Sequence, residues 1–267
     1  KRRRSKAGRH EATARALDNY EVGLVKRRLR MGMIGGGPGS FIGPIHRIAA
    51  ELDREIELVA GVFSSNPGRS RAAADDYRID PARAYDDVGA MLKSEILRAD
   101  VIDFVTIVSP NHHHFPAAKA ALDAGFPVFS DKPMTARLDE ALALADIVHA
   151  SGLDYALSYT YSGYPLVREA RARVAAGELG DIRKVVVEYP QGWLAAPAQG
   201  KQAEWRVDPK QAGQGGCIAD IGVHAFQLAE FITGMRVAEL FADLGTVVPG
   251  RVLDDDCSVL LRFSNGA

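Results

Sequence analysis

The strongest constraint on the fold of this 267-residue chain is a regular alternation of short apolar runs and helical segments between residues 29 and 160. Uninterrupted apolar runs of this length are typical of strands buried on both faces of a sheet. Strands that alternate with helices form βαβ units with a parallel sheet, so this region is predicted as α/β. The expected strands begin at Leu29 and cover 56–63, 101–108, 128–130 and 155–160, and the expected helices cover 45–53, 67–77, 86–94, 116–124 and 135–150.

A glycine-rich turn, GGGPGSFIG, follows the first expected strand and opens the first helix. In dinucleotide sites the first glycine allows a tight turn, the second lets the backbone approach the pyrophosphate, and the third allows close helix–strand packing. Gly35, Gly37 and Gly43 suit these roles, although the last spacing is three residues longer than usual. The turn predicts a Rossmann dinucleotide-binding domain, with a purely structural turn as the alternative.

The end of the second strand bears on which dinucleotide is bound. An NAD site usually has an acid here, which accepts from the ribose 2′-hydroxyl. This sequence has Ser64, Ser65 and Asn66 instead, followed by Arg69 and Arg71. Small hydroxyls and an arginine suit a 2′-phosphate and favour NADP slightly, but the same hydroxyls also serve NAD, and the arginines fit a solvated helix face.

Two further loops follow expected strands, at the sheet edge where ligands bind in such folds. The first, SPNHHHFP (109–116), contains three adjacent histidines, but consecutive residues rarely converge on one ion and no acid or cysteine partner is placed nearby. We therefore expect no metal and assign this loop to the cofactor. The second loop holds Asp131, Lys132 and Pro133, where Lys132 suits a proton relay or a substrate-orienting cation and Pro133 suits a cis bond.

After residue 160 the pattern changes to helices at 165–177 and 224–233 and strands of alternating polarity at 182–189, 237–244 and 257–263. Such alternation favours an open, largely antiparallel sheet, and hence an α+β domain. Within it Asp220 and His224 are four residues apart, which places both on one face of a helix. A histidine is a natural general base, although such a pair is often structural. The predicted domains are a basic extension (1–28), an NAD(P)-binding domain (29–160) and this α+β domain (161–267).

Composition limits the partners. The net charge of −1 gives no global sign of nucleic-acid binding, and the excess of basic over acidic residues in 1–30 (eleven against three) indicates a solvated leader or, less simply, a nucleic-acid tail. The two cysteines, Cys217 and Cys257, suggest free thiols in a reducing compartment. No apolar run approaches the roughly 18 residues of a membrane span, so a cytoplasmic protein is expected.

Four motifs in this order, GGGPGSFIGPIHR, SPNHHH, DKP and GGCIADIGVH, resemble the Gfo/Idh/MocA oxidoreductase family, which includes inositol dehydrogenases and glucose–fructose oxidoreductase. The similarity runs from about Leu29 to the last residue. It implies a dinucleotide domain followed by a large open sheet, whose exposed face forms the interface of a dimer or tetramer. Family members usually continue past SNGA, so the second domain is expected to be incomplete.

The resemblance also implies roles. His224 would take the substrate hydroxyl proton, Lys132 would orient that hydroxyl, and Asp220 would support the pair. The predicted cofactor-binding residues are Gly35, Gly37, Gly43, Ser64, Ser65, Arg69, Ser109, Pro110, Asn111, His114, Asp131 and Lys132.

The resulting hypothesis is an NAD- or NADP-dependent oxidoreductase that acts on a secondary alcohol of a cyclitol or sugar. The alternatives are an NAD-dependent glycoside hydrolase on the same fold and a non-catalytic nucleotide-binding regulator. The residues Tyr161, Tyr164, Trp193, Trp205 and Arg206 are candidates either for a sugar-binding wall or for sheet core, and Tyr164 is retained as a substrate residue.

Overall fold

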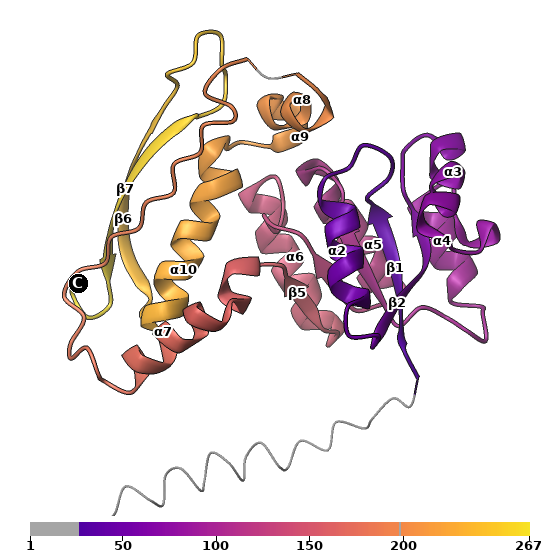
Figure 1. The fold of residues 1–267 in the computed structure, drawn as a ribbon, viewed down its shortest axis with the longest axis horizontal. Coiled ribbons are helices and arrows are strands. Elements are labelled where there is room, and N and C mark those ends of the chain that lie inside the picture. Colours follow the sequence, from indigo (N-terminus) through magenta and orange to yellow (C-terminus); the bar gives the residue numbers. More distant parts are fainter. Residues whose placement is uncertain (1–26, 198) are drawn as a thin grey trace, which may run out of the picture.

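The computed structural model describes residues 27–197 and 199–267, so the predicted extension, apart from its last two residues, lies outside the described part. The first part of the chain is a five-stranded parallel sheet with helices around it (Figure 1). Its strands are β1 (Leu29–Gly35), β2 (Ile56–Val62), β3 (Phe104–Val108), β4 (Val128–Ser130) and β5 (Tyr155–Leu157). The helices between them are α2 (Ile42–Glu51), α3 (Pro67–Tyr77), α4 (Val88–Glu95), α5 (His114–Asp123) and α6 (Leu138–Ser151). The predicted alternation is confirmed.

The strand order, β2-β1-β3-β4-β5, sets where a ligand can bind. The chain moves outward from β1 to β2 and then crosses back to β3 on the other side of β1. In open parallel sheets ligands bind outside the carboxyl ends of the strands at this reversal point. Here the reversal point lies between Gly35 at the end of β1 and Val108 at the end of β3, which are register partners.

Two apolar clusters pack on the two faces of the sheet. One contains Met31, Met33 and Phe63 together with Ala73 and Tyr77 of α3. The other joins alternate residues of the same strands to α4, α5 and α6, and its members include Ile34, Val105, Ile107, Met91, Leu122 and Leu144. Adjacent strand residues point to opposite faces, so burial on both faces accounts for the continuous apolar runs.

The predicted start of α3 is confirmed in detail. Asn66 accepts a hydrogen bond from the Arg69 N–H at 3.0 Å, and Pro67 occupies the first turn, where its missing N–H costs nothing. This cap fixes the chain direction directly after β2. It therefore holds Ser64 and Ser65 at the edge of the sheet.

The part after residue 160 begins with α7 (Pro165–Ala175), which packs against α10 (Val223–Thr233). It ends in an antiparallel pair, β6 (Val237–Gly245) with β7 (Asp256–Phe263), as predicted for both segments. Between α7 and α10 along the chain lie two short helices, α8 (Lys201–Val207) and α9 (Pro209–Ala212), and the π-helical turn η4 (Ile218–Gly222). Short 3-10 turns cover 81–83, 111–113 and 160–163.

The predicted strand at 182–189 is wrong: the segment is extended beside the β6–β7 pair but forms no ladder with a described residue (Figure 1). Its alternating pattern suits a strand, yet a strand exists only where a neighbouring backbone accepts its hydrogen bonds. The Ile182 carbonyl accepts its hydrogen bond from a side chain, Asn265 Nδ2, at 3.0 Å.

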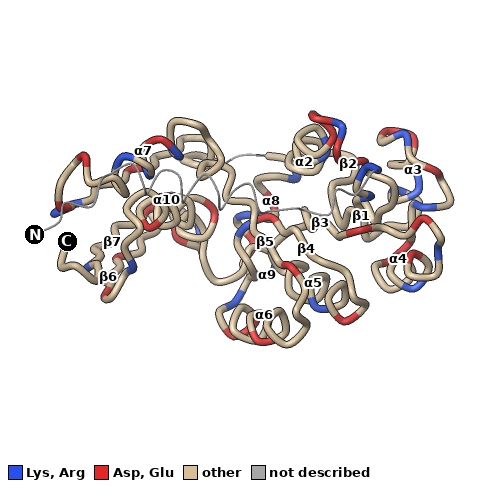
Figure 2. Tube along the Cα trace, turned by 90° about the horizontal axis from the view of Figure 1, so that it is seen from below, with Lys and Arg blue, Asp and Glu red and all other residues tan. Residues whose placement is uncertain are grey.

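Figure 2 shows acidic and basic residues interspersed along the described chain. No helix of the described residues is long and apolar enough to cross a membrane.

Candidate active site

The glycine-rich turn is packed too tightly for side chains at the three predicted positions. A Cβ on Gly35, whose φ is 94°, would lie 2.7 Å from Ser109 N, and one on Gly37 would lie 2.2 Å from Phe63 O. A Cβ on Gly43 would lie 2.3 Å from Gly36 Cα, so the close packing expected of this glycine is present despite the longer spacing. The turn is thereby packed directly against the ends of β2 and β3, at the reversal point.

The start of α2 suits an anion. Its N-cap residue, Phe41, provides no side-chain hydrogen bond, and its first turn holds no acidic residue. The free N–H groups at a helix start attract negative charge. A hollow of about 330 Å³ lies against the turn and is also lined by Arg47 and Tyr77.

The edge beside β2 places the predicted ribose-binding residues together. Ser64 Oγ accepts from Asn66 N at 3.1 Å, and Ser65 and Arg69 are exposed. Arg71 pairs with Asp86, whereas Arg69 has no ion-pair partner among the described residues. Arg69 is thus the arginine of the two that is open to a phosphate.

The loop after β3 is anchored by its own side chains. Asn111 Nδ2 donates to Ala212 O at 2.8 Å, and the buried His114 ring lies between Ser109 O (2.9 Å) and Pro133 O (2.7 Å). Burial lowers the pKa of His114. These side chains hold the loop in place, and the neighbouring Ser109 Oγ is buried without a hydrogen-bond partner among the described residues.

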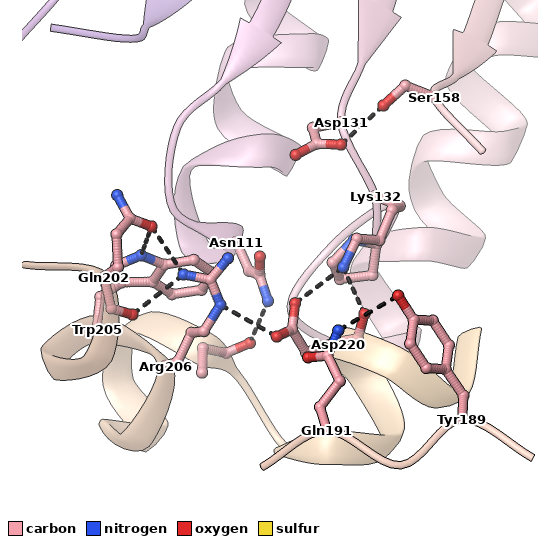
Figure 3. Close-up of polar contacts among 12 residues, drawn as sticks. Asn111, Asp131, Lys132, Ser158, Tyr189, Gln191, Gln202, Trp205, Arg206 and Asp220 are labelled. Carbon is pink, nitrogen blue, oxygen red and sulfur yellow. Dashed lines mark hydrogen bonds and ion pairs between the residues drawn. The ribbon is translucent and has the colours of Figure 1, made fainter. Parts of the chain in front are cut away.

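Asp131 and Lys132 follow β4 and face different neighbours (Figure 3). Asp131 Oδ1 accepts from Ser158 Oγ at 2.7 Å and lies 3.9 Å from His46 Nε2. Lys132 Nζ donates to Asp220 Oδ1 at 2.9 Å and to the Asp220 carbonyl at 2.5 Å. The Lys132–Pro133 bond is cis, which confirms that expectation.

Asp220 lies on η4, and two cations hold its carboxylate. Lys132 binds Oδ1, and Arg206 Nε donates to Oδ2 at 3.1 Å (Figure 3). Burial alone would raise the pKa of Asp220, but the two positive charges and their hydrogen bonds outweigh it and lower the pKa. Asp220 is therefore ionised and directs its oxygens toward Lys132 and Arg206. The four-residue spacing in the sequence predicts a pair of Asp220 with His224, whereas the structure pairs Asp220 with Lys132 and Arg206.

His224, on α10, is kept neutral by its surroundings. Burial, followed by the charge of Lys132, lowers the pKa of His224 to about 4. Of its two ring nitrogens, Nδ1 alone is buried without a hydrogen-bond partner among the described residues. A neutral imidazole with an accessible nitrogen is a competent proton acceptor near neutral pH.

Tyrosines surround this imidazole. The Tyr161 ring centroid lies 4.8 Å from that of His224, and the Tyr161 hydroxyl bonds that of Tyr189. This bond, together with burial, raises the pKa of Tyr161 to about 12. Tyr164 packs edge-on against Tyr161 and is 51% exposed. The aromatic residues thus line the site rather than a sheet core.

Four residues of this site were not among the predicted site residues: His46, Ser158, Tyr189 and, as a partner of Asp220, Arg206. Nothing in their sequence context marks them, apart from Arg206 adjoining Trp205. A cavity of about 260 Å³ beside Asp220 is lined by Arg206, both tryptophans and Arg251, among others. No group of three or more metal-binding side chains occurs among the described residues.

The residues at the reversal point fit a nicotinamide dinucleotide. The acid-free helix start and the close backbone of the turn suit the pyrophosphate. The orphaned Ser109 Oγ beside Gly35 provides a hydrogen-bonding group that no described residue satisfies. Neutral His224 and cationic Lys132 then lie at the same edge of the sheet, where hydride chemistry would need them.

Comparisons with known proteins agree with this geometry. Residues 29–159 match the "Oxidoreductase family, NAD-binding Rossmann fold", and residues 167–267 match the "GFO/IDH/MocA C-terminal domain". The chain therefore belongs to the GFO/IDH/MocA family, as its motifs suggested.

Two similar proteins, one of them in two complexes, illustrate the match. An inositol dehydrogenase homologue from Azotobacter vinelandii, complexed with NAD+, is 37% identical with a TM-score of 0.87, over 91% of this chain and 63% of that one. The structure of its complex with NADH and myo-inositol is 35% identical with a TM-score of 0.83, over 91% of this chain and 62% of that one. The "Uncharacterized oxidoreductase YfiI" of Bacillus subtilis (strain 168) is 32% identical, over 91% of this chain and 64% of that protein. The chain thus spans somewhat less than two thirds of each of these relatives.

Proposed function

We propose that the protein is an NAD-dependent oxidoreductase that oxidises a secondary alcohol of a cyclitol or sugar. The observation that carries this proposal is the convergence of Lys132, Asp220 and His224 beside a dinucleotide-compatible turn. The similar protein that holds NADH and myo-inositol supports the substrate class.

The side chains divide the work by their charge states. The bound nicotinamide supplies the hydride acceptor. His224 Nε2 takes the proton of the substrate hydroxyl as the C–H hydride departs, so the alcohol loses two electrons and two hydrogens and becomes a ketone. Lys132 Nζ, once it releases an oxygen of Asp220, donates a hydrogen bond to the same hydroxyl oxygen and orients it. Tyr164, exposed beside Tyr161, provides an aromatic face for the ring of the substrate.

NAD is the cofactor we propose, because the two structures of the inositol dehydrogenase homologue hold NAD+ or NADH. NADP is the second candidate, because Ser64, Ser65 and the unpaired Arg69 suit a 2′-phosphate. The ratio of NADPH to NADH affinity decides between them. If Arg69 holds the phosphate, Arg69→Ala weakens NADPH alone, whereas under NAD preference it changes neither affinity.

We propose that residues 29–160 and 161–267 act as separate domains, and that the face of the β6–β7 pair mediates self-association into a dimer or tetramer. Its apolar side chains support this: the register partners Phe241 and Leu260, which share one face, are exposed by 67% and 73%. Sedimentation of the wild type and of Phe241→Glu tests the interface.

The proposed reaction is tested by following NAD+ or NADP+ reduction at 340 nm across a panel of inositols and pyranoses, with calorimetry of cofactor binding in parallel. Substrate-dependent reduction that is lost in Lys132→Met supports the proposal. Cofactor binding without turnover of any polyol supports a regulator instead. Release of an aryl group from a glycoside without net cofactor reduction supports a hydrolase.

A further inference from the structure

Helix α8 contacts two parts of the candidate site that are far apart in the sequence. At its start, Lys201 Nζ donates to Pro38 O and Gln202 Nε2 donates to Gly39 O, both at 3.4 Å. At its other end, Arg206 Nε donates to Asp220 Oδ2 at 3.1 Å. One short helix therefore spans from the glycine-rich turn to the carboxylate that holds Lys132.

The Arg206 side chain is restrained on several sides, as Figure 3 shows. Its Nη1 donates to Gln202 Oε1 at 2.8 Å and to Gln202 O at 3.1 Å. Its guanidinium lies over the rings of Trp205, at 4.3 Å from the centroid, and Trp193, at 5.5 Å. A planar guanidinium stacked in this way has little freedom to turn, so its Nε–H is a fixed donor.

Gln202 joins the two ends of this connection. Its amide nitrogen contacts Gly39 of the turn, and its amide oxygen accepts from Arg206. The chain of contacts then continues from Arg206 through Asp220 to Lys132. A group that binds at the turn and displaces the Gln202 amide would thus alter the hydrogen bond that Arg206 donates to Gln202 Oε1.

The orientation of Asp220 depends on Arg206. With both cations present, each takes one carboxylate oxygen. Without Arg206, Asp220 Oδ2 would lose its partner, and Lys132 would be the cation that remains bound to the carboxylate. Lys132 would then be held more firmly by Asp220 and released less readily to a substrate hydroxyl.

We propose that Arg206 is a positioning residue for the reaction, and that α8 couples occupancy of the glycine-rich turn to the orientation of Asp220 through Gln202. This inference rests on the proposed function, because it takes the turn as the dinucleotide site and Lys132 as the group that meets the substrate.

The two tryptophans of the chain provide a direct test of the coupling, because both contact Arg206. Their emission, excited at about 295 nm, is followed while NAD+ is added, since NAD+ does not absorb the emitted light as NADH does. Calorimetry gives the NAD+ affinity independently. We expect an emission change that follows calorimetric binding in the wild type and falls at least by about half in Gln202→Ala.

The possible outcomes are distinct. Calorimetric binding with no emission change, or with the same change in Gln202→Ala, overturns the coupling and leaves the proposed function standing. No calorimetric binding overturns the proposed function and the coupling with it.

Steady-state kinetics test the positioning role. Arg206→Lys keeps a positive charge but loses the fork, and we expect kcat to fall about 10- to 100-fold while KM for the alcohol stays within about threefold. Added guanidinium is expected to restore activity to Arg206→Ala. Arg171→Lys is the matched control, because Arg171 also stacks on an aromatic ring (Phe231, 4.5 Å) and donates to a carbonyl, but on α7. A kcat near the wild-type value in folded Arg206→Ala would overturn the positioning role.

Discussion

The regions before and after residue 160 bury very different side chains. The first packs Met31, Met33, Ile107, Leu144 and many others against two faces of one sheet. Beyond residue 160, the buried apolar residues of the described chain are Ala203, Ala212, Ala229, Leu253 and Phe263. The second region nevertheless supplies Arg206, Asp220 and His224 to the site. The apolar core thus lies mainly in the first region, whereas the candidate site draws residues from both regions.

This difference has a physical basis. A buried apolar core gains free energy roughly in proportion to the area removed from water, whereas paired charges contribute little net stability. The first region can therefore hold Gly35 and Lys132 rigidly on its sheet edge. The second region positions its polar groups by hydrogen bonds, so substitutions there should affect turnover more than unfolding.

The largest effect is expected at His224. His224→Ala removes the proposed proton acceptor, and we expect kcat/KM to fall about 1000-fold with little change in the unfolding midpoint. His149→Ala, at an exposed position on α6, is the control. A fall of less than about tenfold would remove His224 from the chemistry and would weaken the contrast between the regions.

The second-largest effect is expected in the free energy of unfolding, measured in urea, when two leucines are compared. Leu144 is fully buried, and Leu144→Ala should cost about 3 kcal/mol of unfolding free energy. Leu260 is 73% exposed, and Leu260→Ala should change it by about 0.5 kcal/mol or less. Equal costs at the two positions would show that the second region also depends on an apolar core.

A smaller effect is expected in the glycine-rich turn. The Cβ of Gly37→Ala would meet Phe63 O, so the turn must shift and NAD+ affinity should fall about 30-fold, or roughly 2 kcal/mol. Gly245→Ala on β6 meets no atom within 4 Å and is the control. Calorimetry measures both, and an unchanged affinity in Gly37→Ala would contradict the placement of the dinucleotide.

The smallest effect concerns pH. The pKa of His224 lies at about 4, below the ordinary value of 6.5, so the neutral base is present above pH 4 and is lost as the pH falls through that value. We expect kcat/KM to be flat from pH 7 to about 5 and to decline below. A decline centred near 6.5 would mean that His224 is not desolvated in the working enzyme.

Local patterns predicted the first region well, because its central strands are buried on both faces and α3 carries its own start signals at Asn66 and Pro67. The packing of Gly43 against Gly36 was also foreseen from the glycine pattern. Lys132, Asp220 and His224 were each predicted from the sequence, but the pairing of Asp220 with Arg206 was not.

The pairing failed for identifiable reasons. Spacing places Asp220 and His224 on one helical face, but spacing says nothing of Lys132 and Arg206, which reach Asp220 from elsewhere in the chain. The predicted strand at 182–189 failed in the same way, because its hydrogen-bond partners are a tertiary property. Periodicity reports which face a residue occupies, whereas partners depend on long-range packing.

Because η4 is π-helical, the number of residues in this turn is itself a requirement of the site. Val223 N–H donates to Ile218 O, five residues back, so this turn holds one residue more than a regular helix needs. Deleting a residue of the turn other than Asp220 would let a regular α-helix form without losing backbone hydrogen bonds. Because the wide turn absorbs its extra residue locally, the helix on either side would keep its register, whereas Asp220, inside the turn, would change direction relative to Lys132. We therefore expect a deletion that removes no functional group to weaken the proposed reaction as a substitution of Asp220 would.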